Sequence, residues 1–141
     1  GVGAYLKSKN KDISIGLADP MGANMYSFFK TGELKSEGSS ITEGIGQGRI
    51  TKNIKDMSLD IPFRVNDSEA LNILYDLIEE EGLFLGLSSG INIAGAKKLA
   101  KSLGKDKTIV TILCDSANRY QNKMFNAGFL EENNLPIPSW L

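Results

Sequence analysis

Hydrophobic positions in the second half of the chain follow a strand–helix–strand pattern over residues 83–116. Leu83–Leu87 is a short apolar run, long enough for one strand buried on both faces. Small residues break this run at Ser88–Gly90, where a serine can cap a following helix. Residues 91–103 then repeat with a helical period. The β-branched run Thr108–Cys114 is typical of a central parallel strand, so the segment predicts a right-handed βαβ crossover.

Both predicted strands end at serines, the first at Ser88 and the second at Ser116. Ligands in open α/β sheets collect outside the carboxyl ends of the strands. We therefore expect a functional site at the sheet edge that holds Ser88, Ser89, Gly90 and Ser116. On local chemistry alone the first turn also suits a simple helix cap, and Ser116 a cap at the end of a strand.

Further elements are predicted on either side of this unit. Asn66 or Asp67 is expected to cap a clear amphipathic helix that ends at Gly82. The first helix is expected to turn Val2 and Tyr5 toward a core. The full set is a helix over 1–10, a strand over 13–18, a short helix over 21–30, an exposed connection over 53–60, a strand over 61–65, a helix over 68–81, helical residues over 119–129 and an irregular tail over 131–141.

Composition narrows the functional classes. The 141 residues suit one domain, and a net charge of −1 argues against a nucleic-acid partner. No apolar run approaches the roughly 20 residues that a membrane span needs, so no membrane role is expected. Cys114 is the only cysteine. It excludes an internal disulfide, favours a cytoplasmic location and is interpreted as a small buried hydrophobic residue.

The chain contains no histidine. This excludes Ser–His–Asp and Cys–His catalysis and His-ligated zinc, and no metal site is expected. Any chemistry must use carboxylates, lysines, hydroxyls, backbone groups or a cofactor. The three glycines Gly44, Gly46 and Gly48 suit a loop whose backbone closely approaches a ligand. Their spacing and the lack of a preceding strand disfavour a dinucleotide-binding fingerprint.

Several short motifs, spread nearly end to end, match one known family in their order and spacing. They are Gly1–Lys7, Ala18–Pro20, Glu43–Gly46, Ser88–Gly90, Leu113–Ser116 with Arg119-Tyr120, and Pro138–Leu141. Together they resemble the C-terminal portion of cysteine synthase (O-acetylserine sulfhydrylase), a family of fold-type-II enzymes dependent on pyridoxal 5'-phosphate.

The resemblance implies an α/β fold, with a three-layer, open, mostly parallel sheet and helices on both faces, as in tryptophan synthase β chains. Residues 1–141 would form most of the large C-terminal cofactor-binding domain. The N-terminal domain, the phosphate-binding loop and the Schiff-base lysine would all precede Gly1. We therefore expect a piece of a longer protein, with no catalytic residue of its own and no activity in isolation.

The same resemblance implies roles for particular residues. Ser116 matches the serine whose hydroxyl meets the pyridine nitrogen of the cofactor, where a neutral partner favours β-elimination over transamination. Gly44 matches a glycine whose backbone lies beside the cofactor. Ser88, Ser89 and Gly90 match a turn that lines the pocket.

Other matched positions have supporting roles or depart from the family. Arg119 and Tyr120 match a segment to which we assign structure rather than chemistry. Ala117 and Asn118 stand where relatives often have glycine and an acidic residue, which weakens the substrate assignment.

For the whole protein the resemblance implies a transferase that makes cysteine from O-acetylserine and sulfide by β-replacement. It also implies a homodimer and a possible partner, the C-terminal tail of serine acetyltransferase. Two alternatives stay open within the class: a cystathionine β-synthase and a relative that uses O-phosphoserine. An alternative from another class is a non-catalytic α/β module that binds a nucleotide or regulates a partner.

Overall fold

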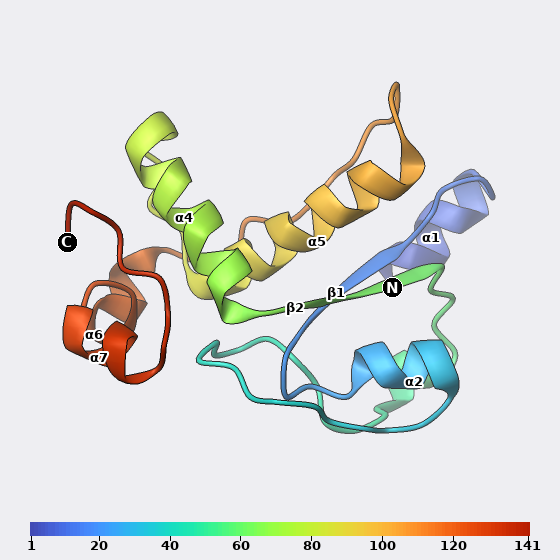
Figure 1. The fold of residues 1–141 in the computed structure, drawn as a ribbon. Coiled ribbons are helices and arrows are strands. Elements are labelled where there is room, and N and C mark those ends of the chain that lie inside the picture. Colours follow the sequence, from blue (N-terminus) through green and yellow to red (C-terminus); the bar gives the residue numbers. More distant parts are fainter.

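Two parallel strands form the centre of the computed structural model, which describes residues 1–141. Strand β1 (Gly16–Pro20) pairs with β2 (Ile61–Val65) from one end to the other, Gly16 opposite Ile61 and Pro20 opposite Val65. Helix α5 (Leu87–Leu103) lies against one face of this sheet and α2 (Met25–Thr31) against the other (Figure 1). The predicted α/β fold, with a parallel sheet and helices on both faces, is confirmed.

The other helices surround this central unit (Figure 1). Helix α1 lies at the N-terminal end, and the last short helices lie together near the C-terminus. They are α1 (Val2–Lys9), α3 (Lys52–Lys55), α4 (Asp67–Glu81), the 3₁₀ helix η1 (Ala117–Tyr120), α6 (Gln121–Met124) and α7 (Ala127–Glu132).

Helix α4 begins and ends as its sequence predicts. The Asn66 side chain accepts from the Glu69 amide, and the Glu69 carboxylate accepts from the Asn66 amide, which together form a capping box. At the other end Gly82 adopts φ 67°, a left-handed conformation that glycine tolerates best. Local sequence therefore sets both limits of this helix.

Helix α5 packs closely on β1 through a glycine. A Cβ added at Gly95 would lie 2.5 Å from the Cβ of Ala18, so only a residue without a side chain fits this contact. Further along the helix, Leu99 lies over Gly16. The helix thus runs antiparallel to the strand, and this direction brings its N-terminus to the carboxyl edge of the sheet.

The predicted βαβ crossover is wrong in this chain. Helix α5 begins at Leu87 with Gly86 as its N-cap, so Ser88–Gly90 lies in its first turn and no serine caps it. The run before it forms no strand, and only Leu85 makes an isolated antiparallel bridge, to Ser116.

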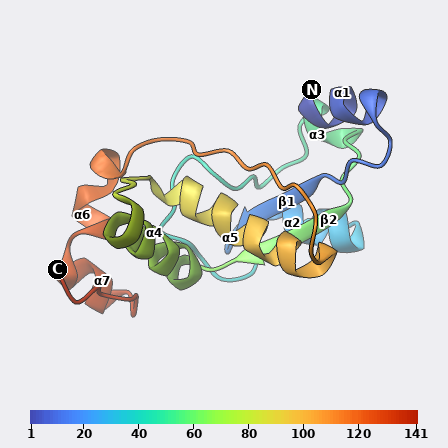
Figure 2. The ribbon, with the colours of Figure 1, turned by 90° about the horizontal axis from the view of Figure 1, so that it is seen from above.

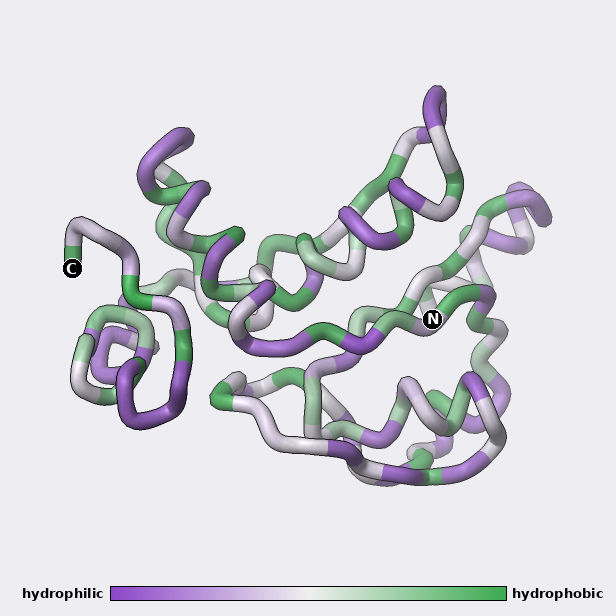
Figure 3. The backbone as a smooth tube through the Cα atoms, in the orientation of Figure 1, coloured by the Kyte–Doolittle hydropathy of each residue, from purple (hydrophilic) through white to green (hydrophobic).

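Thr108–Cys114 also forms no strand. Val110 is 85% exposed, and Cys114 is exposed rather than buried as predicted. Figure 2 shows the segment as a long extended connection beside α5, and Figure 3 marks hydrophobic positions along it. The sheet consists of β1 and β2 alone, and this segment pairs with neither of them.

Other predicted elements are shifted. The first helix is confirmed, but it buries none of its residues and Val2 and Tyr5 are exposed, so its predicted core face is wrong. Strand β1 begins at Gly16 instead of Ile13 and includes Pro20. Helix α3 begins just before the predicted 53–60 connection, and the predicted 119–129 helix is divided among η1, α6 and α7.

Most of the buried hydrophobic side chains form two clusters. The smaller lies between β2, α4 and α5 and consists of Val65, Ala70, Ile91 and Ala94. The larger joins α4 and the start of α5 to the C-terminal helices. Its members are Leu71, Leu74, Tyr75, Leu87, Ala117, Tyr120, Met124 and Leu130. Through this second cluster the segment that follows Ser116 is held beside the carboxyl edge of the sheet.

Candidate functional site

Ser116 lies at the same edge of the sheet as the first turn of α5. The Cys114 amide donates to the Ser89 hydroxyl oxygen at 2.8 Å, and the Gly86 amide donates to the Asp115 carbonyl at 2.8 Å. These bonds fix the two residues that precede Ser116 to the N-terminus of α5, which lies at the carboxyl edge. The expected grouping of the serine turns at this edge is therefore present.

The Ser116 hydroxyl is free to donate a hydrogen bond. Ser116 is exposed and N-caps η1, where its Oγ accepts from the Asn118 amide at 3.3 Å. The hydroxyl donates to no acceptor in the chain. An acceptor such as an aromatic ring nitrogen could therefore take this proton in a hydrogen bond without breaking any existing one.

Gly44 borders open space. Its φ is +72°, and a Cβ added there would meet no atom within 4 Å. The neighbouring Thr42, Ile45 and Gly46 line a cavity of about 370 Å³ beside the end of β1. The Gly44 backbone can therefore be approached closely by a bound molecule.

The Gly44 loop is held from both sides by residues that the sequence did not single out. Asp67, the first residue of α4, accepts from the Ser40 hydroxyl at 2.5 Å and from the Ile41 amide at 2.8 Å. Lys123 on α6 donates to the Ile41 carbonyl at 2.9 Å and to Glu43 Oε1 at 2.5 Å.

The hydrogen bond from Lys123 lowers the pKa of the Glu43 carboxyl. Nothing in a single sequence pairs these two residues, because they are 80 positions apart.

The turn Ser88–Gly90 is packed into the fold. Ser89 is fully buried, and its hydroxyl oxygen satisfies the Cys114 amide. A Cβ at Gly90 would lie 2.8 Å from the Ala70 carbonyl, so this glycine permits the close contact between α4 and α5. Ser89 thus supports the segment that leads to Ser116. Pocket lining by Ser88, Ser89 and Gly90 stays a prediction.

Tyr120 and Arg119 hold the turn around Asp115. The Tyr120 hydroxyl donates to Asp115 Oδ2 at 2.7 Å, and this hydrogen bond raises the pKa of the Tyr120 phenol. Arg119 lies 3.6 Å from the same oxygen. Tyr120 is buried in the larger cluster. The two side chains therefore shape the backbone next to Ser116, in keeping with the structural role assigned to them.

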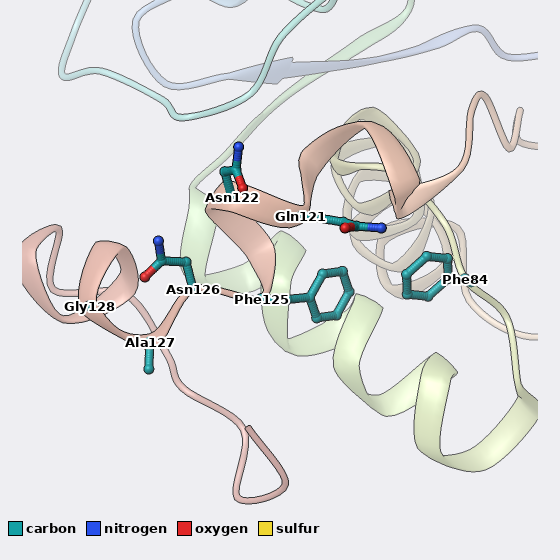
Figure 4. A pocket seen from close by; sticks show the side chains of 7 residues that line it. All are labelled: Phe84, Gln121, Asn122, Phe125, Asn126, Ala127 and Gly128. Carbon is teal, nitrogen blue, oxygen red and sulfur yellow. The ribbon is translucent and has the colours of Figure 1, made fainter.

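A second groove, of about 690 Å³, lies beside α6 and α7 (Figure 4). The Phe84 and Phe125 rings stack with centroids 5.2 Å apart and form its apolar wall. Asparagine and glutamine side chains provide its polar groups. Its remaining lining residues are Gln121, Asn122, Asn126, Ala127 and Gly128. None of the predicted cofactor contacts lines this groove.

None of the helices has the length and apolar character needed to span a bilayer. No group of three or more His, Cys, Asp or Glu side chains is arranged to hold a metal ion.

Comparison with known proteins identifies the class. A family described as "Pyridoxal-phosphate dependent enzyme" matches residues 1–115. The chain therefore belongs to this family, whose cofactor is pyridoxal phosphate.

The individual relatives sharpen this result. The chain is 44% identical to Cysteine synthase 1 of Neurospora crassa over 96% of its own length and 37% of the relative's. It is 37% identical to a cysteine synthase of Dictyostelium discoideum over 97% of its length and 39% of the relative's. The predicted resemblance to cysteine synthases is confirmed, and the chain spans well under half the length of these relatives.

A solved structure shares the fold. It is an O-acetylserine dependent cystathionine beta-synthase from Helicobacter pylori, with a TM-score of 0.74 and 27% sequence identity. The match covers 86% of the chain and 37% of the solved protein. The likeness thus extends over most of this chain and a minor part of that enzyme.

The residues at the carboxyl edge fit part of the cofactor. The free Ser116 hydroxyl suits a ring nitrogen, and the open space beside Gly44 suits a flat ring or its substrate. These two residues would contact pyridoxal phosphate. No residue of the chain is assigned to its phosphate or to the Schiff base.

Proposed function

We propose that the full-length protein makes cysteine from O-acetylserine and sulfide by pyridoxal-phosphate-dependent β-replacement. The observation that carries the proposal is the unpartnered donor on Ser116, at the carboxyl edge and beside the first turn of α5. The family match and the cysteine synthases among the relatives support the same conclusion. Residues 1–141 are proposed to form most of the large cofactor-binding domain.

Ser116 would tune the cofactor without ionising it. When bound, pyridoxal phosphate supplies the electron sink for reactions of the amino-acid substrate. A serine hydroxyl donates a hydrogen bond but keeps its proton, so the ring nitrogen would stay uncharged and the sink would be moderate. This suits elimination and replacement at the β carbon. Gly44 would present its backbone to the bound substrate, with no side chain in the way.

Substitution of Ser116 in the full-length protein tests this assignment. Ser116→Asp should protonate the ring nitrogen, shift the cofactor's visible absorbance and lower the rate of cysteine formation by roughly tenfold or more. Ser116→Ala should keep the cofactor but alter its spectrum less. Ser102→Ala, at an exposed serine on α5, is the control and should change neither property.

An unchanged spectrum and rate for Ser116→Asp would remove this residue from the site. Wild-type protein that cannot be reconstituted with the cofactor would instead favour the non-catalytic module, whether nucleotide-binding or regulatory. The isolated chain 1–141 is proposed to be inactive, and cysteine formation by that chain alone would contradict this.

A second candidate is cystathionine synthesis, which the solved relative from Helicobacter pylori favours. Supplying sulfide or homocysteine and measuring cysteine or cystathionine distinguishes the two. Supplying O-acetylserine or O-phosphoserine identifies the leaving group. We expect O-acetylserine with sulfide to give the higher kcat/KM, and the opposite ranking would assign the alternative.

We also infer a cytoplasmic homodimer that can accept the C-terminal tail of serine acetyltransferase. The single cysteine supports a reducing compartment, while the dimer and the tail rest on the family resemblance. Sedimentation of the full-length protein, and titration with a peptide of that tail, test the two assemblies.

A further inference from the structure

The loop that carries Gly44 is attached to the segment that carries Ser116 through one lysine. Lys123 Nζ donates to the Ile41 carbonyl at 2.9 Å and to Glu43 Oε1 at 2.5 Å. Glu43 is the residue immediately before Gly44. One ammonium group therefore holds both the backbone and a side chain of the loop.

Lys123 projects from a well-anchored position. It lies on α6, which directly follows η1, the short helix that Ser116 caps. Its neighbours Tyr120 and Met124 are buried in the larger cluster. The Met124 carbonyl also accepts from the Tyr75 hydroxyl at 2.7 Å. The base of the lysine is thus fixed relative to Ser116.

Gly44 lies between two fixed points. On one side Glu43 is held by Lys123. On the other side Ile45 packs against the cluster that contains Val65 and Ile91. Gly44 itself has no side chain, and a Cβ added there would meet no atom within 4 Å. Its position is consequently determined by its two neighbours rather than by interactions of its own.

We propose that Lys123 and Glu43 form a clamp that sets the position of the Gly44 backbone relative to the Ser116 hydroxyl. The clamp deepens the proposed function and rests on it, because both positions are the predicted cofactor and substrate contacts. Lys123 is a positioning residue that contacts neither the cofactor nor the substrate in this proposal. Small displacements of groups at a reaction site can cost large factors in rate, so the clamp contributes to turnover.

The chain offers a matched control for this lysine. Lys98 on α5 makes the same kind of double contact, donating to the Arg64 carbonyl at 2.7 Å and to Glu69 Oε2 at 2.9 Å. It connects β2 and α4 and makes no contact with the Gly44 loop. Partly exposed ion pairs contribute little to global stability, so neither lysine is expected to be essential for folding.

The first test compares lysine variants of the full-length holoenzyme. Lys123→Ala should lower kcat/KM for cysteine formation by roughly tenfold and leave the thermal midpoint close to that of the wild type. Lys123→Arg should recover most of the loss, because it keeps the positive charge and the donors. Lys98→Ala should leave kcat/KM within about twofold of the wild type.

Exchanging the two charges tests the pair itself. Glu43→Lys and Lys123→Glu should each lower activity, and the double variant should recover part of it, since only the double variant restores an ion pair. Additive losses with no recovery would reject the pair as the clamp.

Amide hydrogen exchange over residues 41–48 reports the clamp without requiring activity. Lys123→Ala should accelerate exchange in this loop, and Lys98→Ala should not. Unchanged exchange in Lys123→Ala, or equal activity losses for both lysines, would overturn the proposal. If the wild-type protein makes no cysteine, the proposed function fails, and the exchange data still decide whether Lys123 holds the loop.

Discussion

Two segments that were both predicted as strands adopt different states. Ile61–Val65 forms strand β2, pairs along its whole length with β1 and ends at a fully buried Val65. Thr108–Cys114 remains extended but unpaired, with Val110 85% exposed. Thr108–Cys114 is the richer of the two in β-branched residues, so β propensity alone would favour the segment that stays unpaired. The difference is that Ile61–Val65 has a neighbouring strand to pair with and helices that pack on the resulting sheet.

The comparison shows that β propensity expresses itself only where a partner completes the hydrogen-bonded ladder. Thr108–Cys114 is attached to the fold by isolated contacts instead. Asn92 donates to the Ile112 carbonyl at 3.0 Å, and the Cys114 amide donates to Ser89 at 2.8 Å. These contacts place the end of the segment, and so Ser116, without forming a strand.

The largest expected difference between the two segments concerns their valines. Val65→Ala should lower the free energy of unfolding of the 141-residue chain by about 2 kcal/mol, because it leaves a cavity beside Ile91. Val110→Ala should change it by less than about 0.5 kcal/mol, because that side chain is already in water. Denaturant unfolding measures both changes, and equal losses of stability would contradict the inferred difference in burial between the two valines.

The contact between α5 and β1 is expected to give the next largest change in the free energy of unfolding. Gly95→Ala should cost about 1–2 kcal/mol, since the new methyl group meets Ala18 and the gain in helix propensity offsets only part of that. Gly48→Ala is the control, because a Cβ there meets nothing within 4 Å and its φ is not positive. A neutral Gly95→Ala would show that α5 does not lie tightly on the strand.

The C-terminal helices are attached to the rest of the fold by side-chain packing rather than by strand pairing, and Tyr75 makes one of these contacts. Its hydroxyl donates to the Met124 carbonyl, and burial raises the pKa of Tyr75 to about 12. Tyr75→Phe should cost about 1 kcal/mol at neutral pH.

The raised pKa also predicts a pH dependence. The stabilisation from the neutral phenol is complete below the unfolded-state pKa of about 10 and is lost as pH rises toward 12. Unfolding measured from pH 9 to pH 12 should show a decline in the wild type that is reduced in Tyr75→Phe. Identical profiles would mean that Tyr75 does not titrate in this way.

The smallest effect concerns the attachment of the exposed segment. Ser89→Ala removes the acceptor of the Cys114 amide, but water can replace it because Cys114 is exposed. The expected loss is about 0.5 kcal/mol. Hydrogen exchange at the Cys114 amide should accelerate while exchange in α4 stays unchanged. Unchanged exchange at Cys114 would show that Ser89 does not hold this segment.

Elements whose limits depend on local chemistry were predictable. The capping box of Asn66 with Glu69 and the left-handed Gly82 define α4, and Gly32, with φ 81°, ends α2 close to the predicted limit of residue 30. Strand β2 has the predicted limits as well. For the two helices the residues that decide these limits lie within a few positions of one another, whereas β2 also needs its partner β1.

Features that depend on distant residues were not predictable. The exposure of Cys114 follows from a missing neighbouring strand, which its own segment cannot signal. The clamp joins Lys123 to Glu43, 80 residues away, and Asp67 holds Ile41 from 26 residues away. No local pattern distinguishes these charged residues from others on the surface.

The sequence by itself determined the family, the capped helices and the short list of serines and glycines near the carboxyl edge. Caps, turns and motifs are made by residues close together in the chain, so they can be identified there. Only the tertiary structure decided that Thr108–Cys114 stays unpaired, that Ser89 supports the approach to Ser116 and that Lys123 holds the Gly44 loop. Strand pairing and ion pairs between remote residues depend on where the folded chain brings their partners.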